Sequence, residues 1–145
     1  MMKKFLYILL VILLLLSGCG KKEALVDFEL SDVADMQVGY AVKSYAHDVE
    51  ENQWEEIISY LEKADYLGEF EEDDKEVSDY VLDSKELQFV LVYFNNGNKT
   101  RSFDISVRED GSAYVFQYFD PVARYKIWKV DSKLAEIITG MYESY

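Results

Sequence analysis

Apolar and polar residues alternate in several short runs of the chain, which is the pattern of half-buried β-strands. In residues 99–107, Phe103 and Ile105 point to one face, whereas Ser102 and Asp104 point to the other. Residues 87–94, LQFVLVYF, are apolar on both faces and predict a central strand. The expected strands are residues 36–46, 87–94, 99–107, 112–119 and 123–130.

Two other stretches space their apolar residues with the period of an amphipathic helix. One helix is expected at about 50–64, with Asp48 as its N-cap, and the other follows Asp131 or Ser132, either of which can cap it. The apolar stripes are Trp54, Ile57, Ile58 and Leu61 in the first helix and Leu134, Ile137, Ile138 and Met141 in the second.

Short turns and one long connection separate these elements. Residues 95–98 (NNGN) and 109–111 (EDG) predict hairpin turns, because Asn-Gly and Asp-Gly adopt positive φ angles at low cost. Asp120-Pro121 ends the strand before it. Residues 65–86 are rich in acids and predict a long solvated connection, with at most one short strand at 80–82.

The order of elements predicts an α+β fold, a two-layer sandwich. An antiparallel meander sheet of four or five strands would carry two helices on one face. The strands at 87–94 and 112–119 are apolar on both faces, so the second face also needs cover from the N-terminal segment, a partner or a second copy. Four strand tyrosines form the candidate interaction face, unless they pack beneath the helices. They are Tyr93, Tyr114, Tyr118 and Tyr125.

The N-terminus has the pattern of an export signal, with Lys3 and Lys4 followed by twelve apolar residues, 5–16. Twelve helical residues span about 18 Å, which is too short for a hydrocarbon core of roughly 30 Å. The run ends in Leu16-Ser17-Gly18-Cys19, which resembles the lipobox of bacterial lipoproteins.

That resemblance implies cleavage before Cys19 and lipidation of its sulfur, with Leu16, Ser17 and Gly18 as the cleavage motif. Two acyl chains would anchor the protein stably on the extracytoplasmic face of the cell membrane. The expected division is a signal peptide at 1–18, a partly mobile lipidated tether at 19–35, and one α+β domain at 36–145.

The chain is strongly acidic, with 28 Asp and Glu against 15 Lys and Arg and a net charge of −13. The expected signal contains two lysines and no acid, so the chain from Cys19 onward would carry −15. Nucleic acid is therefore not an expected partner, because phosphates attract basic surfaces. The expected partners are the bilayer, through the acyl anchor, and a protein of the cell envelope; the oligomeric state stays open.

Side chains suited to catalysis are few. The chain has one histidine, His47, and one cysteine, so a Ser-His-Asp triad would have to use His47, for which an exposed turn is expected. A zinc site needs three or four ligands, and nothing selects a glycosidase pair among the acids. The run 71–74 lacks the spacing of a calcium loop and is expected to be solvated. No enzyme activity, metal or cofactor is expected.

The pattern as a whole resembles the small uncharacterised lipoproteins of Gram-positive bacteria. The features that carry this resemblance are LSGC at 16–19, WEEIISYL, NNGN, EDG, ARYKIW and LAEII. The expected function is a non-enzymatic binding or accessory module for an envelope protein. The alternative is an acidic immunity or inhibitor protein, which would bind a basic toxin or hydrolase through its carboxylates.

Overall fold

The computed structural model describes residues 23–43, 46–97 and 99–144 of the chain. The expected signal peptide and the lipobox cysteine, Cys19, lie outside the described residues.

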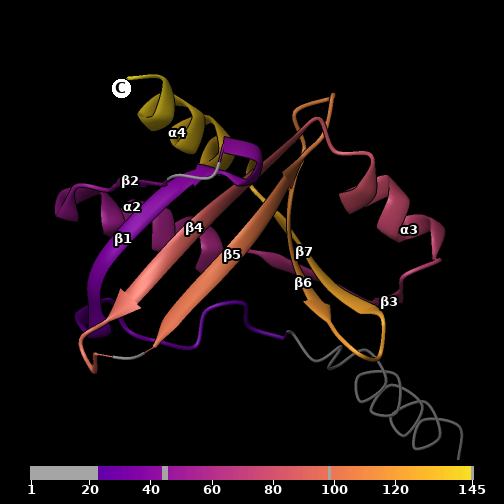
Figure 1. The fold of residues 1–145 in the computed structure, drawn as a ribbon, viewed down its shortest axis with the longest axis horizontal. Coiled ribbons are helices and arrows are strands. Elements are labelled where there is room, and N and C mark those ends of the chain that lie inside the picture. Colours follow the sequence, from indigo (N-terminus) through magenta and orange to yellow (C-terminus); the bar gives the residue numbers. More distant parts are fainter. Residues whose placement is uncertain (1–22, 44–45, 98, 145) are drawn as a thin grey trace, which may run out of the picture.

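A single seven-stranded antiparallel sheet forms the centre of the fold (Figure 1). Its strand order is β2-β1-β4-β5-β6-β7-β3, so the apolar strand β4 lies inside the sheet, as its sequence predicts. The fold is α+β, as expected, but the sheet has more strands than the four or five that the pattern predicts. The strands are β1 (Val33–Tyr40), β2 (Ala46–Asp48), β3 (Asp65–Glu71), β4 (Glu86–Phe94), β5 (Thr100–Val107), β6 (Ala113–Phe119) and β7 (Arg124–Val130).

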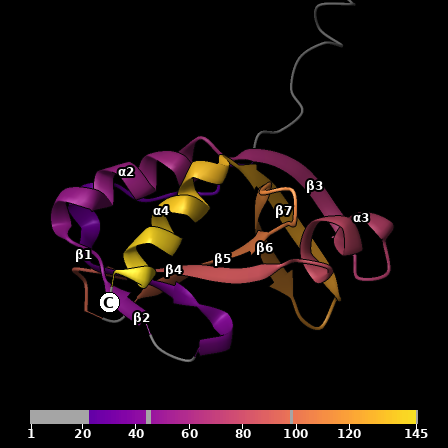
Figure 2. The ribbon, with the colours of Figure 1, turned by 90° about the horizontal axis from the view of Figure 1, so that it is seen from above.

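Two amphipathic helices, α2 (Glu51–Glu62) and α4 (Ser132–Glu143), lie together on one face of the sheet (Figure 2). Their apolar stripes pack with the strands into the main core, in which Phe103 and Trp128 are the largest fully buried side chains. The carboxylate of Asp131 accepts a hydrogen bond from the backbone N–H of Lys133 and caps α4, as expected. The two expected helices are present on one face, but the described residues also contain a third, short helix, α3 (Lys75–Val77), that was not expected.

The expected strand at 36–46 is divided by a turn. Strand β1 ends at Tyr40, the 3₁₀ turn η2 (Ala41–Lys43) follows, and β2 returns beside β1. Val42 continues the alternation in sequence but is 80% exposed in the turn. Asp48 belongs to β2 and accepts a hydrogen bond from Gln37, so it does not cap α2.

The expected solvated connection at 65–86 is wrong, because it contains a strand and a helical segment. Strand β3 forms the edge of the sheet, and α3 (Lys75–Val77) runs into a π-helical turn, η3 (Ser78–Leu82). The acids of β3 lie opposite basic residues of β7, which explains how so acidic a run can pair. The register pairs are Asp65 with Lys129, Glu69 with Lys126, and Glu71 with Arg124.

Much of the expected tether packs into the fold. Leu25 is 2% exposed in the main core, and Phe28 lies against Phe94 with ring centroids 5.0 Å apart. Arg101 donates hydrogen bonds to the carbonyl of Leu25 and to Asp27. A 3₁₀ turn, η1 (Leu30–Asp32), then leads into β1, which starts three residues earlier than expected. The segment 23–29 shares the core with α2 and α4, so it covers the same face of the sheet as the helices.

Replacement of Leu25 by alanine is expected to lower the free energy of unfolding by about 2–4 kcal/mol, because the side chain is buried in a packed core. Urea denaturation measures the change. Leu30→Ala is the matched control, since Leu30 is 40% exposed and its truncation should cost less than about 1 kcal/mol. Equal effects of the two substitutions would show that the N-terminal segment does not stabilise the fold.

Candidate functional site: the open face of the sheet

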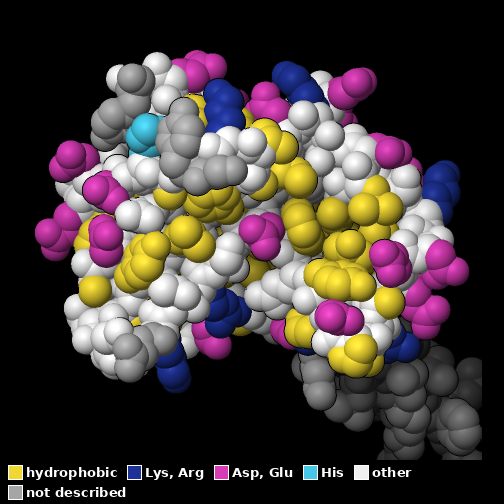
Figure 3. Space-filling view, viewed as in Figure 1, with side chains coloured by type: hydrophobic (Ala, Val, Ile, Leu, Met, Phe, Trp, Pro, Cys, Tyr) yellow, Lys and Arg dark blue, Asp and Glu magenta, His cyan; other side chains and the backbone are white. Residues whose placement is uncertain are grey.

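The face of the sheet opposite α2 and α4 is the candidate site. In Figure 1 it faces the viewer, and the lower parts of β4 and β5 have no helix in front of them. Figure 3 shows hydrophobic side chains in two areas of this face, one over β1 and β4 and one over β6, β7 and α3, with polar and acidic side chains between them. We call this surface the open face and define it by Phe89, Leu91, Tyr93, Ser102, Asp104, Phe116, Tyr118 and Tyr125.

The α3–η3 segment covers only the part of this face over β6, β7 and the end of β5, where the buried Ser106 hydroxyl donates a hydrogen bond to the carbonyl of Tyr80. Val77 and Val81 pack there with Tyr114 and Ile127 in a second, smaller core. The ring of Tyr80 lies 4.7 Å from that of Tyr114, centroid to centroid. This segment is the cover that an apolar second face requires, and the sequence analysis missed it.

The four predicted tyrosines lie on one face, as the alternation of the strands indicates, but their environments differ. Tyr114 is 9% exposed beneath η3 and is not available to a partner. Tyr118 is 47% exposed, and its ring lies 4.9 Å from that of Tyr125. Tyr93 is on β4, two strands away, and donates a hydrogen bond to Gln37. None of the four packs beneath α2 or α4, so the alternative position predicted for them is wrong.

Asp104 is the residue of this face that sequence reasoning did not select. The register places it directly between Phe89 of β4 and Phe116 of β6. Its carboxylate accepts a hydrogen bond from the Ser102 hydroxyl at 3.2 Å, and no Lys or Arg of the described residues lies within ion-pair distance of it. The alternation along β5 alone predicts that Asp104 faces solvent. The aromatic residues at the paired positions of both neighbouring strands are the signal that could have identified it.

The carboxyl group of Asp104 is accessible to solvent, yet its neighbours remove part of its hydration. This desolvation raises the pKa of Asp104 above its ordinary value, against the smaller opposite effect of the Ser102 hydrogen bond. Desolvation, followed by the charges of Glu72 and Asp120, also raises the pKa of Tyr118. The open face therefore combines aromatic rings with nearby carboxylates.

His47 is not an exposed turn residue, as the sequence predicted. It lies on β2, half-buried, opposite Val38 of β1. Its ring meets that of Tyr142 edge to face, with centroids 4.7 Å apart. The position of His47 is that of a packing residue at the end of the main core.

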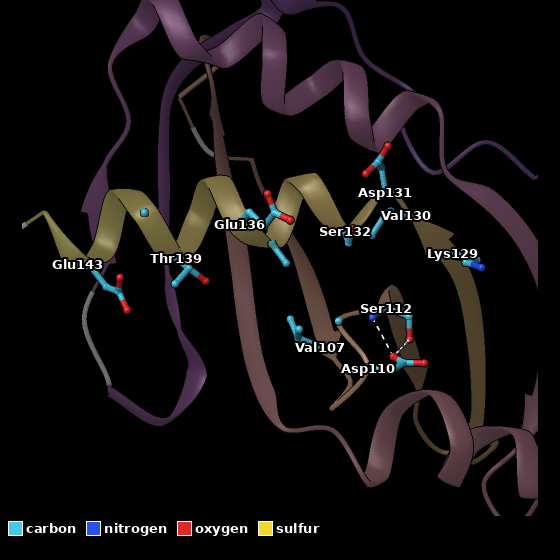
Figure 4. A pocket seen from close by; sticks show the side chains of 13 residues that line it. Val107, Asp110, Ser112, Lys129, Val130, Asp131, Ser132, Glu136, Thr139 and Glu143 are labelled. Atoms are coloured by element: carbon cyan, nitrogen blue, oxygen red, sulfur yellow. Dashed lines mark hydrogen bonds between the residues drawn. The ribbon is translucent and has the colours of Figure 1, made fainter.

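A groove of about 760 Å³ runs between α4 and the β5–β6 hairpin (Figure 4). Carboxylates of Asp110, Asp131 and Glu136 line it, and Asp110 is held in its own turn by hydrogen bonds from the backbone and hydroxyl of Ser112. Within the described ranges, no three His, Cys, Asp or Glu side chains are grouped as a metal site requires. The groove offers polar surface without a set of converging reactive groups.

The acidic run 71–74 forms a tight turn at the end of β3. The carboxylate of Asp74 accepts a hydrogen bond from the backbone N–H of Glu71, and Glu71 pairs with Arg124 at 3.3 Å. Arg124 also pairs with Glu69 at 3.1 Å. These contacts hold the turn against β7 and give its acids a structural role.

No known protein family, curated protein or solved structure matches this chain. Within residues 23–43, 46–97 and 99–144, no helix combines the length and the hydrophobicity that crossing a membrane requires.

Replacement of Asp104 by asparagine is expected to stabilise the folded protein at pH 7 by about 0.5 kcal/mol or less. The folded state binds the Asp104 proton more tightly than the unfolded state, so the ionised carboxylate destabilises the wild-type protein above its raised pKa. The gain should disappear as the pH falls below the ordinary pKa of aspartate. The phenol of Tyr118 stays neutral in this range, because desolvation raises its pKa above the ordinary value near 10.

Urea denaturation of both proteins between acidic and neutral pH measures this difference. The control is Glu55→Gln, which changes the net charge equally at an exposed position on helix α2. A loss of stability at pH 7 in Asp104→Asn alone would contradict the desolvation of Asp104.

Proposed function

We propose that this protein is a lipid-anchored, non-enzymatic accessory module that binds a protein of the cell envelope through its open face. The observation that carries the proposal is the unequal cover of the sheet. Both long helices pack on one face, while aromatic residues on the other face stay half-buried or exposed beside a partly desolvated carboxylate. Such a surface is typical of interfaces, where aromatic residues contribute most of the binding free energy.

The anchor is the second part of the proposal and depends on the lipobox at 16–19. Glu23 is held at the sheet, because its carbonyl accepts a hydrogen bond from Trp128 and its carboxylate pairs with Lys126. Cys19 and Glu23 are four positions apart in the sequence, and a fully extended chain spans about 14 Å at most over that length. Lipidation at Cys19 would therefore hold the domain close to the bilayer, where an integral membrane protein is an accessible partner.

The contacts of the acidic residues favour this function over an immunity or inhibitor protein that uses its carboxylates. Several acids near the sheet edge are already paired within the chain: Glu69 and Glu71 with Arg124, and Glu23 with Lys126. Binding of a basic cleft through these carboxylates would first break the internal pairs. The open face can bind a partner without that cost.

Photo-crosslinking in cells tests the proposal. The full chain would carry p-benzoylphenylalanine at Tyr118 on the open face or, as control, at Glu55, an exposed residue of α2. We expect a discrete adduct with an envelope protein from position 118 and none from position 55. The Cys19→Ser variant should leave the membrane fraction or keep an uncut signal, and should lose the adduct.

Two outcomes would overturn the proposal. The same set of adducts from positions 118 and 55 would mean that the open face has no selective partner. Retention of the Cys19→Ser variant in the membrane, with a cleaved N-terminus, would mean that Cys19 does not carry the anchor.

A further inference from the structure

At the centre of the open face, the exposed Asp104 stands in a row between two aromatic residues, and we call this row the slot. Phe89, Asp104 and Phe116 stand opposite one another on the adjacent strands β4, β5 and β6 and project from the same face. Two strand spacings place the backbones of the two phenylalanines about 10 Å apart. Both rings are half-buried, so part of each remains accessible beside the carboxylate.

Among the residues that the structure describes, no Lys or Arg forms an ion pair with the carboxylate in this slot. It accepts a hydrogen bond from the Ser102 hydroxyl. A carboxylate beside aromatic rings costs free energy through lost hydration. A cation that entered the slot would offset that cost, and the ring faces would also attract it.

An arginine side chain matches the chemistry of this slot better than a lysine side chain does. Its guanidinium group is planar, stacks on aromatic rings and donates two parallel hydrogen bonds to a carboxylate. We propose that the open face binds a partner protein whose contact surface presents one arginine among apolar residues, with the guanidinium between Phe89 and Phe116 and paired with Asp104. This inference rests on the proposed function and names the chemistry of the partner.

A second copy of this chain is a poorer occupant of the same surface. Two open faces in contact would bring the two Asp104 carboxylates toward each other in a partly dehydrated interface. Each chain also carries a net charge of −13, which opposes self-association. The electrostatic complement of the open face is a basic group on another protein.

NMR titration of the full chain in a nonionic detergent tests the inference without knowledge of the partner. The probe is the peptide acetyl-Leu-Arg-Leu-amide, and its control contains citrulline, the neutral isostere of arginine, in place of the arginine. We expect shifts of the Phe89, Asp104 and Phe116 resonances at millimolar concentrations of the arginine peptide. The citrulline peptide should bind roughly threefold to tenfold more weakly.

Two variants make the result specific. Asp104→Asn should remove the preference for arginine over citrulline, whereas Asp65→Asn, with the same change in net charge on β3, should keep it. Equal binding of the two peptides, no binding, or shifts confined to other surfaces would overturn the inference. A crosslink from position 118 together with equal binding of the two peptides would contradict the arginine slot and leave the proposed function standing.

Discussion

The structure depends on one constraint: a sheet with two apolar faces needs cover on both, and the two long helices lie on the same side. Helices α2 and α4, with the segment 23–29, bury one face in a continuous core. The short α3–η3 segment covers the other face only over β6, β7 and the end of β5 at Ser106. The rest of that face presents aromatic rings and Asp104 to solvent, and this imbalance is the basis of the proposed function.

Charge pairing completes the sheet where hydrophobic burial is weak. Strand β3 would be a poor strand alone, since three of its seven residues are acids, but β7 places Lys129, Lys126 and Arg124 opposite them. Acids on an exposed edge also discourage pairing with another chain. The acidic residues therefore have a structural role at this edge. The carboxylate of Asp104, in contrast, lies between aromatic residues and forms no ion pair with any Lys or Arg of the described residues.

Prediction from sequence succeeded where local pattern and tertiary environment agree. The strand predicted at 87–94, the Asn-Gly turn, in which Gly97 has a φ of +80°, and the Asp131 cap of α4 are all present. Prediction from sequence failed where the structure of a segment depends on contacts with residues far away in the chain. The acids of β3 appear solvated until β7 is placed beside them, and the apolar residues of 23–29 have no periodicity that reveals their place in the core.

The candidate site shows the same division. Alternation along each strand correctly placed Tyr93, Tyr114, Tyr118 and Tyr125 on one face. Burial of Tyr114 could not be predicted, because it depends on η3, a segment expected to be a solvated connection. Asp104 was not selected from the sequence, because it stands out only through its neighbours Phe89 and Phe116. The strand register brings these two residues beside it, although they are distant from it in the sequence.

The central claim is that Asp104 lies in an apolar part of an otherwise accessible face. The most direct test is the pKa of its side chain, followed through the ¹³C resonance of the carboxyl group during a pH titration of the full chain. The account predicts a pKa above the ordinary value for aspartate, as desolvation by the surrounding residues requires. A pKa at or below the ordinary value would show a well-hydrated or cation-paired carboxylate and would contradict the account.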